Sequence, residues 1–129
     1  MNLGLEGKAF VVGGASKGLG RGIAEALLAE GARVLLVSRD PAAAAAELGE
    51  RAIPRAADLE TVEGIETVVA AARQLGGLDG IVVNSGGPPP GDVLGTDDEQ
   101  WELAFRLLVG NPVRLIRALR PELSDGASI

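Results

Sequence analysis

Seven residues near the N-terminus form a glycine-rich turn, Gly14-Ala15-Ser16-Lys17-Gly18-Leu19-Gly20. Glycine adopts positive φ angles and has no Cβ, so backbone amides in such a turn can approach an anion closely. A helical pattern of apolar residues runs from Gly18 to Glu30, and the start of a helix offers unpaired N–H groups. The turn is therefore predicted to bind the pyrophosphate of a dinucleotide, through Gly14, Ser16, Lys17, Gly18, Leu19 and Gly20.

The spacing of this turn separates it from other glycine-rich loops. A P-loop ends in Gly-Lys-Ser/Thr, whereas Lys17 here precedes Gly18. The three-residue gap after Gly14 also differs from the general Gly-x-Gly-x-x-Gly spacing. A plain structural turn is the alternative, but the position between a first strand and a first helix favours phosphate binding.

Ser38 and Arg39 bear on which dinucleotide is bound, because they follow the predicted strand 33–37. NAD sites usually place an acidic residue there, which bonds the ribose 2′-hydroxyl. Without that carboxylate a 2′-phosphate is not repelled, and Arg39 offers it a fork of donors. Lys17 lies on the same side and adds a second cation. Either cation alone could be a solvated surface charge, but together with Ser38 they predict NADP(H).

Strands and helices alternate along the chain. Strands are predicted at 8–12, 33–37, 53–57 and 81–83, with 127–129 opening a fifth. Helices are predicted at 18–30, from the run 42–46 to near Gly49, at 61–75 and at 96–119, the last interrupted at 110–112. Asp40 is expected to be the N-cap of the second helix, with Pro41 at its first helical position. Apolar strands alternating with helices predict an α/β fold, a doubly wound parallel sheet of the Rossmann type. It would span 1–129 as one NADP-binding domain and be incomplete at its C-terminal end. Ligands of such sheets bind beyond the carboxyl ends of the strands.

Composition excludes several other functions. The formal net charge is -6, which argues against nucleic acid as a partner. The chain has no cysteine and no histidine, so neither a thiolate nor a histidine metal site is expected. Neither a signal peptide nor an apolar stretch near the ~20 residues of a membrane span is present, so a cytoplasmic protein without membrane partners is expected.

From these motifs, the chain resembles the N-terminal half of short-chain dehydrogenases/reductases. The segment Gly13–Gly20 resembles the family's T-G-x-x-x-G-x-G, with glycine in place of threonine. The pair Asp58-Leu59 resembles the family's acidic–apolar pair after strand three, which holds the adenine. The segment Asn84-Ser85-Gly86-Gly87 resembles the family's N-N-A-G segment after strand four. The resemblance implies additional cofactor-binding residues: Asp58, Leu59, Asn84, Ser85 and Gly86. NADP-preferring members of the family show the same pair of basic positions.

The resemblance also implies a reaction, hydride transfer between NADP(H) and a carbonyl or alcohol, similar to that of 3-oxoacyl-carrier-protein reductases. The substrate would be a small-molecule or acyl-carrier-linked carbonyl. The family's catalytic Ser and Tyr-x-x-x-Lys fall beyond Ile129, and the chain contains no tyrosine. No catalytic residue is therefore expected within it, and the chain alone is predicted to be inactive, as a fragment or a truncated product.

Two alternatives to a reductase remain open. One is a non-catalytic dinucleotide-binding module or truncated pseudoenzyme. The other, a methyltransferase of related architecture, is disfavoured by the glycine spacing and by Ser38, because an acidic residue is wanted at that position.

The predicted helix 98–119 departs from the family. The family's catalytic Asn lies seven residues after the Trp that opens this helix, and Leu108 occupies that position here, counted from Trp101. Pro112 has no N–H and cannot bond the carbonyl of Leu108. We therefore expect this carbonyl to stay available to a water of the proton relay, with an ordinary proline kink as the alternative. The helix is apolar nearly all round, which predicts a homo-oligomer interface or a face covered by a C-terminal half.

Overall fold

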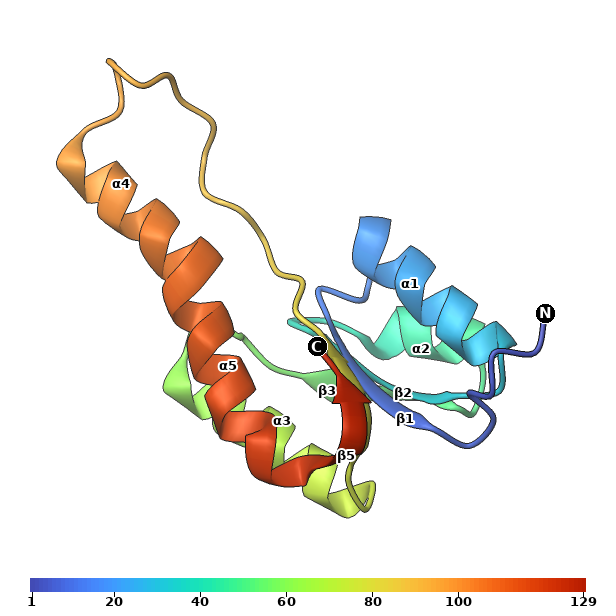
Figure 1. The fold of residues 1–129 in the computed structure, drawn as a ribbon. Helices are drawn as coiled ribbons and strands as arrows, with labels where there is room; N and C mark the ends of the chain where they lie inside the picture. Colours follow the sequence, from blue (N-terminus) through green and yellow to red (C-terminus); the bar gives the residue numbers. More distant parts are fainter.

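Five parallel strands form one sheet between two layers of helices in a computed structural model that describes residues 1–129 (Figure 1). The strands are β1 (Ala9–Gly13), β2 (Arg33–Ser38), β3 (Ala52–Ala56), β4 (Leu78–Val82) and β5 (Leu123–Ser128). They lie in the order β3-β2-β1-β4-β5, with β1 in the centre. The predicted doubly wound parallel sheet is confirmed.

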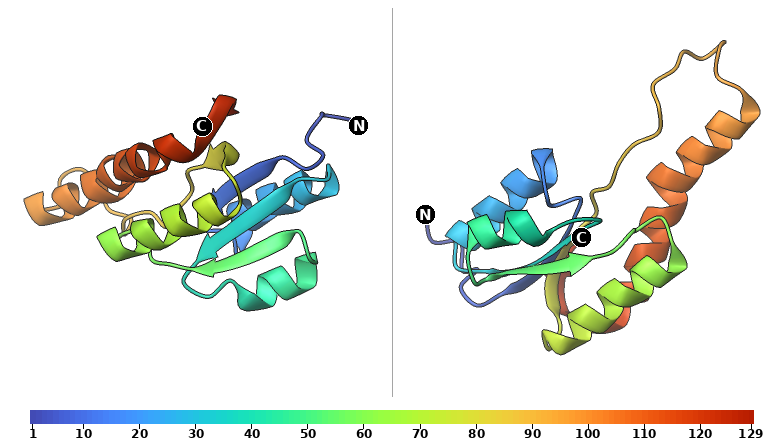
Figure 2. Two further views of the ribbon diagram at one scale, coloured as in Figure 1. Left: turned by 90° about the horizontal axis from the view of Figure 1, so that it is seen from below. Right: turned by 180° about the vertical axis from the view of Figure 1, so that it is seen from behind.

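The helices cover both faces of this sheet. They are α1 (Gly18–Ala29), α2 (Ala42–Leu48), α3 (Val62–Gln74), α4 (Asp98–Phe105) and α5 (Asn111–Leu119). Helices α1 and α2 lie on one face, and α3 and α5 lie on the other (Figures 1 and 2). Right-handed crossovers put α1 and α2 on one face while the strand order runs outward from β1 to β3. They put α3 and α5 on the other face once the order reverses toward β4 and β5.

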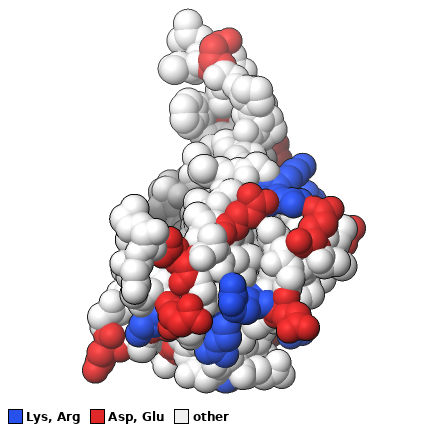
Figure 3. Space-filling model, turned by 90° about the vertical axis from the view of Figure 1, so that its right-hand side faces the viewer, with Lys and Arg blue, Asp and Glu red and all other residues white.

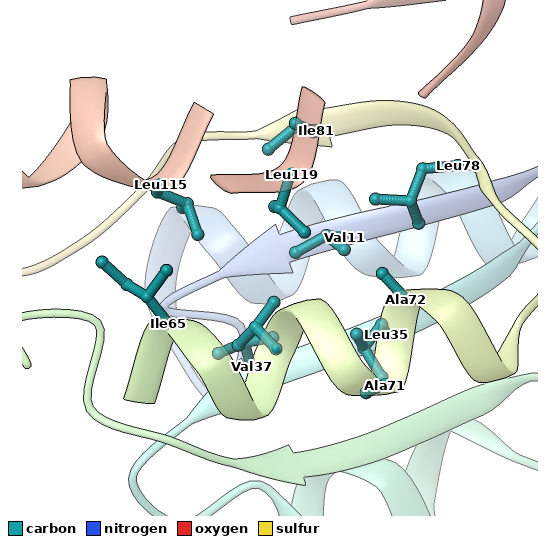
Figure 4. Packing of buried hydrophobic residues seen from close by; sticks show 11 residues of the cluster. Val11, Leu35, Val37, Ile65, Ala71, Ala72, Leu78, Ile81, Leu115 and Leu119 are labelled. Atoms are coloured by element: carbon teal, nitrogen blue, oxygen red, sulfur yellow. The ribbon is translucent and has the colours of Figure 1, made fainter. Parts of the chain in front are cut away.

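The apolar core has two parts because side chains of a strand alternate between the two faces of the sheet. Val11 of β1 belongs to a cluster with residues of α3 and α5, including Val68 and Leu115 (Figure 4). Its neighbour Val12 points to the other cluster, with residues of α1 and α2 such as Leu28. Full burial of one Val or Leu side chain contributes about 1.5–3 kcal/mol, so β1 is held firmly from both sides.

Two predicted boundaries are wrong. The fifth strand begins at Leu123 rather than at Ala127, and it pairs with β4 through Leu78 and Gly80. It therefore completes a five-stranded sheet in which β4 is an inner strand. Asp40 was expected to cap α2, but Pro41 occupies the cap position and no side chain bonds there.

The expected interruption near Pro112 takes a different form. Residues 98–119 make one continuous helical rod, in which a π-helical turn, η1 (Arg106–Gly110), joins α4 to α5. A short 3-10 turn, η2 (Arg120–Glu122), then leads into β5. Pro112 lies in the first turn of α5, where a missing N–H costs little. A π turn accommodates the proline without a break in the helix.

The α4 end of the rod and the loop before it project away from the sheet (Figures 1 and 2). Figure 3 shows charged side chains of both signs interspersed over the body of the molecule, whereas the projecting part is mostly uncharged on that face. Several large apolar side chains of the rod are exposed, among them Trp101, Phe105 and Leu108. None of the helices has the length and hydropathy that a membrane crossing needs.

Candidate functional site

The predicted site residues gather at the carboxyl edge of the sheet. The glycine turn follows β1, Ser38 ends β2, Asp58 follows β3 and Asn84 follows β4. The backbone N–H of Ala15 donates to the carbonyl of Val37 at 3.2 Å, which fastens the turn to the end of β2. Parallel pairing of β1 with both β2 and β4 brings these segments to one edge.

The glycine turn has the backbone geometry that its sequence predicts. Gly14 and Gly18 have φ angles of 57° and 58°, in the region that L side chains avoid. Lys17 occupies the N-cap of α1, and no side chain bonds the amides of the first turn. The first amides of a helix have no intrahelical acceptor, so those of α1 are available to an anion.

Asn84 holds the turn in place from the neighbouring strand. Its side-chain Nδ2 donates to the carbonyl of Gly13 at 3.0 Å. A Cβ at Gly14 or at Gly20 would lie only 2.7 Å from that nitrogen. These glycines are therefore required for packing against Asn84, in addition to any contact with a ligand.

Two exposed cations belong to the segments at the end of β2 and in the glycine turn, and Ser38 stands where NAD sites usually place an acidic residue. Lys17 and Arg39 are exposed, and neither takes part in any of the ion pairs of the structure. The hydroxyl of Ser38 is buried and has no hydrogen-bond partner. A buried hydroxyl without a partner has lost its hydrogen bonds to water and has gained none in return, which costs free energy. The arrangement fits a phosphate group beside Ser38, with the two cations free to turn toward it.

The Asp58-Leu59 pair lies between β3 and α3 and is half-buried. One carboxylate oxygen of Asp58 accepts from the backbone N–H of Glu60 at 2.9 Å. The other carboxylate oxygen makes no hydrogen bond within the chain. Leu59 packs close to Gly13, where an added Cβ would lie 3.0 Å from its Cδ1. The pair therefore reaches the base of the glycine turn.

Asn111 also belongs to this edge, which the sequence reasoning missed. It lies at the start of α5 and is only 5% exposed. A cleft at the edge is lined by residues of the β3–α3 loop, the end of β4 and α5: Leu59, Glu60, Val83, Asn84, Ser85, Asn111, Pro112 and Leu115. Helical spacing could have revealed this position, because Asn111, Leu115 and Leu119 recur every fourth residue and share one buried stripe.

The π-helical turn changes the hydrogen bonds around Leu108. The N–H of Asn111 donates to the carbonyl of Arg106, five residues back, instead of that of Leu107. Pro112 has no N–H for the carbonyl of Leu108. Two successive carbonyls therefore lack their α-helical donors. The Leu108 side chain itself is 58% exposed.

Comparison with known proteins identifies one protein family over most of the chain. A family model described as short chain dehydrogenase matches residues 8–128. The 3-oxoacyl-[acyl-carrier-protein] reductase of Vibrio harveyi is 38% identical over 101 residues, which cover 75% of this chain and 41% of that protein. The chain spans about half the length of the curated relatives it matches.

Two solved structures are similar over most of the chain. The L-sorbose reductase from Gluconobacter frateurii, complexed with NADPH and L-sorbose, has a TM-score of 0.87 and 37% identity, covering 95% of this chain and 50% of that one. The 3-ketoacyl-(acyl-carrier-protein) reductase from Brucella melitensis, complexed with NADH, has a TM-score of 0.81 and 32% identity, covering 92% and 51%. Similar structures thus occur with either nicotinamide cofactor.

Proposed function

Because the chain belongs to the short chain dehydrogenase family, we propose that it is the NADP(H)-binding part of a carbonyl reductase. The proposal is carried by two exposed cations that form no ion pair, Lys17 and Arg39, together with Ser38 at the strand end where NAD sites usually place a carboxylate. The glycine turn would hold the pyrophosphate, and Asp58 and Leu59 the adenine. Asn84, Ser85 and Gly86 would line the cofactor from the end of β4.

The preference for NADP(H) is tested by comparing NADPH and NADH in calorimetric titrations of the purified protein. We expect NADPH to bind more tightly, because only NADPH carries the 2′-phosphate. One hydrogen bond to a charged group contributes about 1.5–3 kcal/mol, so Arg39→Ala should weaken NADPH binding at least about 10-fold. Binding of NADH should change little in the same variant. Equal affinities of the parent protein for the two cofactors would contradict the proposal.

The proposed reaction reduces a carbonyl to an alcohol, with a 3-oxoacyl-carrier-protein-like or related keto substrate. The relatives of the chain are oxidoreductases, and an acyl-carrier-protein reductase is among them. The bound nicotinamide supplies the hydride. The chain has no tyrosine, so the proton donor expected of the family is not among these 129 residues. We therefore propose that these 129 residues bind the cofactor without turning over a carbonyl by themselves.

The same dinucleotide site would serve a non-catalytic module. The reductase and the non-catalytic module would share every cofactor-binding residue. They differ only in whether a catalytic Ser and a Tyr-x-x-x-Lys motif lie beside the cofactor. Reading the coding sequence beyond residue 129 separates them. A Ser followed by Tyr-x-x-x-Lys supports the reductase, and a stop codon supports the module.

The π-helical turn gives the reductase a route for protons. The carbonyl of Leu108 lacks an α-helical donor because of Pro112, and the exposed Leu108 lies on the projecting rod. In the proposed mechanism this carbonyl accepts a hydrogen bond from a water, which takes the place that the family gives to its Asn. The side chain at position 108 has no part in that contact.

The rod 98–119 is also the proposed interface of a homo-oligomer. Its exposed apolar residues Phe105, Leu108, Val109 and Val113 lie in the middle. Acidic residues 97–99 and Glu102 crowd its start, and Arg114, Arg117 and Arg120 its end. Two antiparallel copies would bury the apolar middle and set each acidic end against a basic end. The charge pattern thus favours a symmetric pair.

A further inference from the structure

The side-chain amide of Asn111 has an unusual environment. The residue is buried, and its Nδ2 has no hydrogen-bond partner. Its Oδ1 faces only the guanidinium of Arg114, at 3.5 Å, which is the outer limit of a hydrogen bond. Asn111 is the one buried residue of the structure whose side chain is polar.

A buried amide without partners is costly, because it gives up hydration and gains nothing in return. Buried polar side chains in native proteins are almost always satisfied, so an exception calls for a physical cause. The partner that satisfies such a group is an ordered water, an ion or a ligand. An apolar residue in the same place would pack on Leu115 without that loss.

The position of Asn111 indicates which ligand. It lines a cleft together with Leu59, Asn84 and Ser85, three residues proposed to contact the cofactor. Leu59 and Asn84 both lie against Gly13, at the position that a Cβ of this residue would occupy. The cleft therefore opens at the point where the proposed adenine segment meets the end of β4.

A primary amide is chemically suited to adenine. The base presents an amino donor next to a ring-nitrogen acceptor, and an asparagine side chain offers an acceptor and a donor in matching positions. We propose that the amide of Asn111 hydrogen-bonds the adenine ring and so contributes to the choice of base. This inference rests on the proposed function, because it takes the cleft to be part of a dinucleotide site.

The test uses two probes that differ only in the base. One is 2′,5′-ADP, and the other is the same ribose bisphosphate without a base. The variant Asn111→Leu keeps the branched shape and the number of heavy atoms of the side chain and replaces the amide oxygen and nitrogen with two methyl groups. It should bind 2′,5′-ADP about 5- to 10-fold more weakly than the parent protein, as expected for one or two lost neutral hydrogen bonds. Its affinity for the probe without a base should stay within about twofold.

Thermal unfolding distinguishes a binding role of Asn111 from a purely structural one, because loss of a structural contact would lower the unfolding temperature. Since the amide is unsatisfied in the free protein, Asn111→Leu should unfold at the same temperature as the parent protein or higher. If this variant does not fold, Asn111→Ala also removes the amide, and the same selective loss is expected. Arg39→Ala is the matched control, because it should weaken binding of both probes.

Each other outcome is decisive. Equal binding of 2′,5′-ADP by Asn111→Leu and the parent protein would overturn the inference and leave the proposed function intact. An equal loss for both probes would also overturn it, since the change would then act on the whole site. If the parent protein binds neither probe, the proposed function itself fails.

Discussion

The side chain of Asn84 donates a hydrogen bond to the carbonyl of Gly13, and this contact joins the end of β4 to the start of the glycine turn. The two residues are 71 positions apart in the sequence. The same nitrogen packs close to Gly14 and Gly20. The shape of the phosphate-binding turn thus depends on a residue of another strand.

Replacing Asn84 should therefore disturb the glycine turn, although Asn84 itself is not proposed to contact the pyrophosphate. Asn84→Ala removes the bond to Gly13 and should lower the free energy of unfolding by about 1 kcal/mol. It should also weaken NADPH binding, measured by calorimetry, because the turn loses its support. Asp79→Asn, a change on the same strand but away from the turn, is the control for stability. If both variants bind NADPH as the parent does, Asn84 does not shape the turn.

Two glycines of α1 make a matched pair. A methyl group at Gly20 would collide with the carbonyl of Gly14 and approach Nδ2 of Asn84, whereas one at Gly22 would meet nothing within 4 Å. Gly20→Ala should therefore destabilise the protein by about 1–3 kcal/mol and abolish NADPH binding. Gly22→Ala should stabilise it by about 0.5–1 kcal/mol through helix propensity and leave binding unchanged. Chemical denaturation and titration measure both, and similar behaviour of the two variants would refute the packing argument.

Asp79 predicts a pH dependence of stability. The backbone N–H of Ala9 donates to its carboxylate at 2.9 Å, and Lys8 and Ser124 add contacts, which together hold the pKa of Asp79 below its usual 3.8. A lowered pKa in the folded state stabilises the protein above about pH 4, and this stabilisation is lost as the pH falls through the folded-state pKa. Asp79→Asn should cost about 1 kcal/mol at pH 7, a figure that allows for solvent screening.

The difference between Asp79→Asn and the parent should shrink on acidification. Denaturant titrations at pH 7, 4 and 2.5 measure it. A difference that stays constant down to pH 2.5 would show that the charge of Asp79 contributes nothing.

The proposed oligomer interface can be tested with a single charge. Phe105 is 65% exposed in the middle of the rod, and Phe105→Asp would place a carboxylate in the centre of the pair. We expect the assembly to dissociate into monomers in analytical ultracentrifugation. Val62→Asp introduces the same charge at an exposed position of α3 and should leave the assembly intact. A parent protein that is already monomeric at high concentration would contradict the interface.

Local patterns predicted most of the fold, because apolar runs and helical spacing identify strands and helices directly. The missed features depend on tertiary contacts. Strand β5 contains Ser124, Asp125 and Gly126 and lacks an apolar run, so only its pairing with β4 makes it a strand. The π turn arises because Pro112 must be accommodated within a continuous rod, and spacing alone suggests a break there.

The proposed cofactor site likewise combines local features with long-range contacts. The glycine turn has a local signature, and its φ angles follow from the glycines themselves. The contact of Asn84 with Gly13 and the burial of Asn111 join segments far apart in the sequence. The sequence prediction for this helix rests on the spacing from Trp101 to Leu108, whereas membership of the buried stripe of α5 decides where Asn111 lies.

The strand order has a consequence for how the protein folds. Strands β1, β2 and β3 pair with their sequence neighbours, so that each pairing closes a connection of one helix only. Pairing of β4 with β1 must close a loop of about 70 residues, which is slow because chain entropy is lost before contacts form. Asn84 reaches Gly13 only after that step. The glycine turn should therefore acquire its shape late, and a dinucleotide would find its site only on a chain whose sheet has closed around β1.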